Sequence, residues 1–235
     1  MAALNESARR ADNRSMRHGS IALLAAAAIF GVPMARAARP GDAERWRSVD
    51  PSAFVDARIV QGTERPKRIW TRRHRDDVLE FERCFVRVTR HSHQVGETLY
   101  VFQKPIGTEK VMQGATPDFT IGQDPGWFFG VSGNHLFVDA GSSWPRGLMA
   151  YELPKGRLVL FALYLDDPGL PVLKDGRWLS YVEELEDEPS PGPDCPDAVR
   201  WREQGRPMGF EEEVIFDLKT LKKERSGKVH CSTRM

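Results

Sequence analysis

Four short apolar runs between Gly126 and Asp166 constrain the fold most strongly. Turn signals separate them at Gly133-Asn134, at residues 144–147 and at residues 154–156. Short apolar runs that alternate with Gly, Pro and Asn turns are typical of antiparallel strands joined by tight connections. The stretch therefore predicts a meander of four antiparallel strands.

The last of these runs, residues 157–165, is apolar at both odd and even positions. A strand that is apolar on both sides is expected at the centre of a sheet, covered on both faces. Periodicity alone does not exclude a helix for so short a run. The tight turn before it, together with its aromatic and β-branched residues, favours a strand.

Residues 148–161 resemble the outer hairpin of a β-propeller blade, and residues 214–231 repeat that shape weakly. A complete propeller usually needs at least four blades of about 40 residues, and only two hairpins can be marked here. The sequence therefore predicts an all-β, mainly antiparallel fold, either an irregular β-sandwich or a partial β-propeller-like meander.

Strands are also expected before the meander. Residues 53–61 are read as a first strand, and residues 78–103 as a hairpin. Within residues 78–90 the apolar parity changes from odd to even, which predicts a β-bulge near Arg83. Residues 104–125 are interrupted often by Gly and Pro and are expected to form a loop with one short strand.

The N-terminus carries the three parts of a secretory signal peptide. Arginines precede an apolar run from Ile21 to Phe30, and the small-residue site Ala35-Arg36-Ala37 follows. The run is shorter than the roughly 20 residues that span a bilayer, although an uncleaved anchor is the alternative. We expect a Sec-type signal at 1–37, a linker at 38–52 and one β-rich domain at 53–235, located in the periplasm or secreted.

Composition sets limits on the partners. The leader holds five Arg against Glu6 and Asp12, so cleavage after Ala37 would change the net charge from +1 to −2. A nearly neutral chain has no global field to attract nucleic acid or membranes. We therefore expect no nucleic-acid partner and, after cleavage, no transmembrane span.

Three cysteines occur in the sequence. In an oxidising compartment two of them should pair. Cys195 lies in a turn-rich segment and Cys231 in the C-terminal tail, where the backbone can bend, whereas Cys84 lies in a strand-like run as a small buried hydrophobe. The expected disulfide is Cys195–Cys231.

Residues 63–77 gather basic side chains around a tryptophan. The candidate binding residues are Arg65, Lys67, Arg68, Trp70, Arg72, Arg73 and Arg75. One interpretation is a solvated surface whose charges are balanced by nearby Asp and Glu. The other is a site for an anion, because the planar guanidinium matches carboxylate and phosphate and Trp70 could stack.

Catalytic and metal motifs are weak. His135, Asp139, Ser142 and Ser143 supply the residue types of a hydrolytic triad, but the G-x-S-x-G elbow is missing. His91 and His93 have a feasible ligand spacing without a recognisable third ligand, and the acidic run 183–188 lacks EF-hand spacing. We assign no catalytic residue, no metal site and no cofactor.

Two functions remain in competition. The preferred one is a non-catalytic exported protein that binds an anionic envelope component or another exported protein, with a purely structural or inhibitory role as a variant of it. The alternative is a carboxylate-dependent hydrolase of an envelope polymer, for which Asp118, Asp124 and Asp139 are the first acids to consider.

Overall fold

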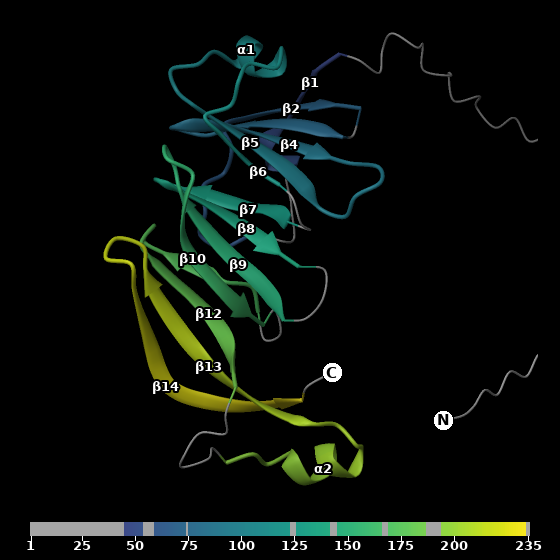
Figure 1. Cartoon of the computed structure of the whole chain (residues 1–235), viewed down its shortest axis with the longest axis vertical. Coiled ribbons are helices and arrows are strands. Elements are labelled where there is room, and N and C mark those ends of the chain that lie inside the picture. The colour runs from purple at the N-terminus through teal and green to yellow at the C-terminus, as the bar shows by residue number, and fades with distance from the viewer. Residues whose placement is uncertain are drawn as a thin grey trace, which may run out of the picture. The chain divides into compact units, whose positions relative to one another are not determined.

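A computed structural model describes residues 45–53, 59–73, 75–122, 126–141, 145–165, 169–186 and 194–233. These residues form an all-β fold of antiparallel strands arranged in three sheets (Figure 1). The expected signal peptide, residues 1–37, lies outside the described residues.

The first sheet, here the N-terminal sheet, contains six antiparallel strands in sequence order. They are β1 (Arg47–Val49), β2 (Arg68–Arg72), β3 (Asp76–Glu80), β4 (Cys84–Arg90), β5 (Glu97–Gln103) and β6 (Phe119–Ile121). A short 3-10 helix, η2 (Pro51–Ala53), follows β1, and α1 (Thr108–Met112) lies in the loop before β6. The segment expected to be a linker thus contributes β1 to this sheet.

The middle sheet is the four-stranded meander predicted from the sequence. Its strands are β7 (Gly126–Ser132), β8 (His135–Ala140), β9 (Arg146–Glu152) and β10 (Arg157–Tyr164), each paired with the next. Gly133 has a φ of 54° in the β7–β8 turn, a conformation that glycine adopts at little cost. The predicted meander of four antiparallel strands is confirmed.

The C-terminal sheet consists of β11 (Val172–Lys174), β12 (Trp178–Leu185), β13 (Met208–Asp217) and β14 (Lys222–Thr233). The helix α2 (Ala198–Glu203) lies between β12 and β13. Cys195, just before α2, is bonded to Cys231 in β14, which confirms the expected disulfide.

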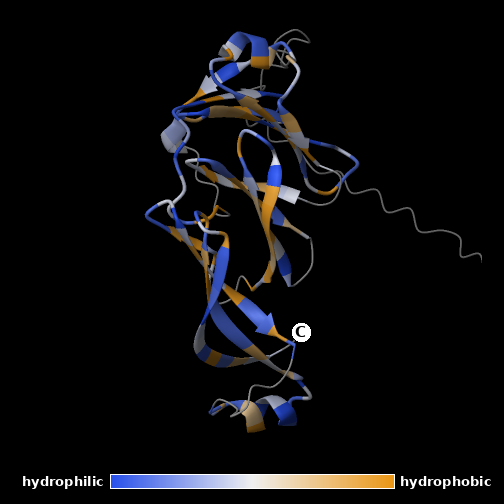
Figure 2. Cartoon of the chain, turned by 60° about the vertical axis from the view of Figure 1, so that its left-hand side comes forward, coloured by the Kyte–Doolittle hydropathy of each residue, from blue (hydrophilic) through white to orange (hydrophobic). Residues whose placement is uncertain are grey.

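Two apolar layers join the three sheets. One layer packs the inner face of the N-terminal sheet, including Val86 and Val101, against Leu136 and Val138 of the middle sheet. The other packs the opposite face of the middle sheet against the C-terminal sheet, with Tyr164 among its fully buried side chains. Figure 2 shows hydrophobic (orange) and hydrophilic (blue) residues interspersed along the strands.

Two strand predictions were wrong. Residues 78–90 do not form one bulged strand, because the chain reverses at residues 81–83 and β3 pairs with β4. The parity change near Arg83 therefore comes from a hairpin turn. Register shifts of the bulge type occur instead in β7, β10 and β13, between Phe128 and Gly130, Leu158 and Leu160, and Glu212 and Val214.

Strand β10 is not central. It is the edge of the middle sheet, and Leu158, Phe161 and Leu163 are 47%, 58% and 49% exposed. The C-terminal sheet covers the side that bears Leu160 and Tyr164. The N-terminal sheet packs on β7, β8 and part of β9 and leaves the other side of β10 open.

Candidate anion-binding site

The structure divides the seven candidate binding residues among three places. Arg65 and Lys67 lie in the loop before β2, and Arg73 and Arg75 lie in the turn between β2 and β3. The other three, Arg68, Trp70 and Arg72, alternate along β2 and share its outer face, since Ile69 points into the core between the sheets.

Carboxylates balance three of these cations. Antiparallel pairing places Arg68 opposite Glu80 and Arg72 opposite Asp76. The Arg72 guanidinium lies 2.8 Å from the Asp76 carboxylate, Arg68 Nε lies 3.9 Å from Glu80 Oε2, and Lys67 pairs with Glu82. Exposed pairs of this kind contribute only about 0–1 kcal/mol each, so their role is mainly to neutralise charge.

The Trp70 side chain packs against other apolar residues of the protein. It lies against an apolar cluster on the outer face of the N-terminal sheet, together with Val78 and Phe85. The aromatic ring beneath the Arg72 guanidinium is that of Trp46, 4.8 Å from the ring centre. The structure thus gives Trp70 a packing role, and the ring that stacks with Arg72 is that of Trp46.

Four arginines gather at one end of the N-terminal sheet. The backbone N–H of Arg90, at the end of β4, donates to the Arg75 carbonyl at 2.7 Å. This contact brings the β2–β3 turn beside the β4–β5 turn. We call the group formed by Arg72, Arg73, Arg75 and Arg90, with the carboxylates Asp76, Asp77 and Glu97, the basic end.

Arginines outnumber carboxylates at the basic end. Arg90 pairs with both Asp77 (2.6 Å) and Glu97 (3.0 Å). Burial opposes the charged form of Arg90, but hydrogen bonds to Asp77 and the charges of both carboxylates raise the pKa of this guanidinium above its usual value. Arg75 is exposed and has no carboxylate partner among the described residues.

The surface at this end is concave. A hollow of about 730 Å³ is lined by Arg72, Arg73, Arg75 and Asp76. Arg73 adopts a φ of 57°, which turns the chain so that the arginines of the turn border one hollow. Such a group can bind carboxylate or phosphate through charge-assisted hydrogen bonds.

An apolar pocket of about 540 Å³ opens where the N-terminal and middle sheets diverge. Its lining comes from β5 and β6 on one wall and from β8 and β9 on the other. The main apolar residues of the lining are Leu99, Phe119, Ile121, Val138, Met149 and Tyr151. Glu97 of the basic end also lines it.

The two acids considered for hydrolysis that the structure describes, Asp118 and Asp139, are both held by structural partners. Asp139 is buried, where it accepts hydrogen bonds from Arg146 (2.9 Å from Nε) and from the Tyr164 hydroxyl (3.1 Å). Asp118 accepts the Gln103 backbone N–H at 2.6 Å. Asp124, Ser142 and Ser143 lie outside the described residues. Burial lowers the pKa of His135, which lies at the start of the strand that carries Asp139.

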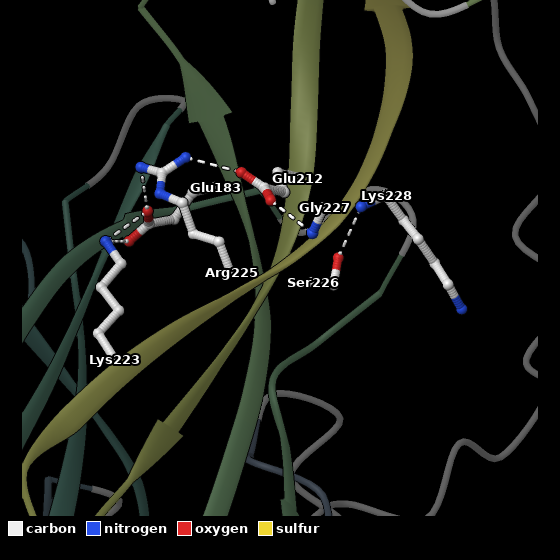
Figure 3. Close-up of polar contacts among 7 residues, drawn as sticks. All are labelled: Glu183, Glu212, Lys223, Arg225, Ser226, Gly227 and Lys228. Atoms are coloured by element: carbon white, nitrogen blue, oxygen red, sulfur yellow. Dashed lines mark hydrogen bonds and ion pairs between the residues drawn. The ribbon is translucent and has the colours of Figure 1, made fainter.

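A second set of carboxylates lines a groove beside β10. Glu183 binds Lys223 (2.6 Å), and Glu212 binds Arg225 (2.8 Å) and the Gly227 backbone N–H (2.8 Å), as Figure 3 shows. Phe161 and Leu163 form the apolar side of the same groove. Because cations hold both carboxylates, this network ties β12 and β13 to β14.

The histidines near the basic end make no metal site. His91 Nε2 lies 2.9 Å from Thr98 Oγ1, and His93 is exposed. Among the described residues, no group of His, Cys, Asp and Glu side chains has the geometry to hold a metal ion.

Sequence reasoning missed Arg90 and Glu97. They lie outside the basic stretch. The pairing of β3 with β4 brings Arg90 to it, and the pairing of β4 with β5 places Glu97 opposite Arg90. The available signal was their position on either side of the turn at residues 91–96. In a sheet of sequential antiparallel strands every second turn lies at the same end, so this turn lies at the same end as the turn between β2 and β3.

Comparisons with known proteins found no matching family model, curated protein or solved structure. In the part of the chain that the structure describes, no helix is both long and apolar enough to cross a bilayer.

Proposed function

We propose that this protein is exported to the periplasm or the exterior, where it binds an anionic envelope component, or the acidic surface of another exported protein, without catalysis. The binding site is the basic end of the N-terminal sheet. Arg73 and Arg75 contact the anion directly, and Arg72 and Arg90 add positive charge beside them.

One observation carries the proposal: two hairpin turns bring four arginines together against three carboxylates, and three of these arginines line a hollow. An arginine whose N–H groups already donate to carboxylates has few donors left for a ligand. The Arg75 guanidinium has no carboxylate partner among the described residues, so its N–H groups can donate to a bound anion. The exposed pairs around it are weak, so an anion can compete for their arginines as well.

The disulfide supports the compartment, because such bonds persist in oxidising spaces. The hydrolase alternative has less support. Glycoside hydrolysis requires two carboxyl groups about 5–10 Å apart across a cleft. Four glutamates line one groove here, Glu183, Glu184, Glu186 and Glu212. Of these, Glu183 is bound to Lys223 and Glu212 to Arg225.

The test is cosedimentation of the purified protein with phosphatidylcholine vesicles that contain phosphatidylglycerol. We expect Arg73→Glu/Arg75→Glu to reduce the bound fraction at least tenfold, since the change reverses the sign of the field at the hollow. Binding by the unmodified protein should weaken steeply between low and high salt, as screening shortens the reach of exposed charges.

The matched control is Arg202→Glu/Arg206→Glu. These exposed arginines lie in and just after α2, and the double change alters the net charge by the same amount. Equal losses in both variants would mean that only net charge matters, and the basic end would then not be the site.

A further inference from the structure

We propose that the ligand is a single-chain anionic lipid, a fatty acid or a lysophospholipid. Its head group binds at the basic end and its acyl chain enters the apolar pocket between the N-terminal and middle sheets. This inference rests on the proposed function and names the chemical class of its ligand.

The first support is that the two sites are joined by direct contacts. Arg75 accepts the Arg90 backbone N–H, Arg90 pairs with Glu97 at 3.0 Å, and Glu97 lines the pocket. Glu97 also accepts the backbone N–H of Phe128 in β7 at 2.8 Å. The basic end and the apolar pocket therefore have Glu97 in common.

The second support is the chemistry of the lining. Leu99, Ile121 and Val138 present only hydrocarbon to the pocket, and the Tyr151 hydroxyl is directed to the sulfur of Met149 at 3.2 Å. The polar side chains of the lining are Glu97, which is paired with Arg90, together with Thr120 and Tyr151. Its volume of about 540 Å³ is in the range that holds one small ligand.

The third support is the surface next to the pocket. Register pairs Leu158 with Tyr151 and Phe161 with Met149, so these β10 side chains lie on the same face as the pocket lining. The register shift between Leu158 and Leu160 is what places both on that face. The apolar face therefore continues from the pocket onto exposed β10, which suits a linear chain.

The glycines at the rim keep the pocket open. A Cβ on Gly156 would lie 2.6 Å from the Phe119 ring, and one on Gly122 would lie 2.9 Å from Thr98. Both have positive φ and both line the pocket. The absence of a side chain at Gly156 leaves room for Phe119, which lines the pocket, and its absence at Gly122 leaves room for Thr98 beside the pocket.

The experiment is calorimetric titration below the critical micelle concentration. The probes are octanoate, decanoate and laurate, lauroyl-lysophosphatidylglycerol, zwitterionic lauroyl-lysophosphatidylcholine, and glycerophosphoglycerol as a head group without a chain. Affinity should rise about fourfold per added methylene, which corresponds to roughly 0.8 kcal/mol for each buried CH₂. Comparison of laurate with the lysophospholipid identifies which of the two is preferred.

Ala140→Phe fills the pocket from β8, and Ile121→Trp fills it from the edge strand β6. We expect each to weaken binding of laurate or lauroyl-lysophosphatidylglycerol at least tenfold, while thermal melting shows a folded protein. Val199→Phe, on exposed α2, adds a ring far from the pocket and should change nothing.

The outcomes separate the two proposals. If the anionic probes bind without dependence on chain length, and both filled variants bind as the unmodified protein does, the pocket is not the acyl site and the anion site alone stands. If no anionic probe binds at all, the lipid inference is overturned, and vesicle binding then decides the proposed function by itself.

Discussion

Asp217 shows how one residue can fix a turn in this protein. At the end of β13 it accepts hydrogen bonds from Arg177 Nε (2.8 Å), the Thr220 hydroxyl (2.8 Å) and the Lys219 backbone N–H (2.9 Å). The Arg177 hydrogen bond is the largest effect, and it holds the pKa of Asp217 well below its usual range, although burial acts in the other direction. The charged form therefore stabilises the fold.

The direction of the pH dependence follows from that shift. A carboxyl group whose pKa is lower in the folded state contributes stability above its unfolded pKa, about 3.9, and this contribution is lost as the pH falls through the folded value. We expect Asp217→Asn to lower the melting temperature at pH 7, and the difference from the unmodified protein to shrink below about pH 4. Thermal unfolding followed by circular dichroism at pH values from 7 to 2 measures this difference in melting temperature. A difference that stays constant over this range would contradict the assignment.

At the scale of the element, the disulfide holds the segment before α2 to β14. Cys195 and Cys231 are 36 residues apart, and closing a loop of that length removes entropy from the unfolded chain worth about 4 kcal/mol. We expect Cys195→Ser to lower the free energy of unfolding by up to about that amount, measured by denaturant titration.

The control uses the remaining thiol. Cys84 is buried, and burial raises the pKa of its thiol to about 12, so it should resist alkylation in the folded protein and react after denaturation. Reduction of the unmodified protein should reproduce the loss seen in Cys195→Ser. If reduction leaves stability unchanged, the bond does not constrain the chain as described.

Local sequence signals predicted the elements well where turns were explicit. Gly133-Asn134 and Gly156 mark reversals, so the meander from β7 to β10 was predictable. The β3–β4 turn at residues 81–83 contains no Gly or Pro, and a strand with a bulge was inferred instead. The position of β10 at a sheet edge could not be predicted, because its apolar residues on both sides resemble those of a central strand.

At the scale of the whole molecule, the stacking of the sheets produces the site. The sequence indicated that residues 65–75 carry an excess of cations, but strand register decides which of them are paired. Arg90 and Glu97 join the basic end through the β3–β4 and β4–β5 pairings. The pocket exists because the N-terminal sheet leaves part of the middle sheet uncovered. Neither feature is local in sequence.

The most direct measurement of the central claim is a map of backbone amide shifts by nuclear magnetic resonance during titration with lauroyl-lysophosphatidylglycerol. The account predicts one group of shifted amides at residues 72–76 and 90–97, around the head group, and a second at 119–122, 138–141 and 149–151, along the chain. Shifts confined to α2 and β14, or no shifts at saturating lipid, would contradict it.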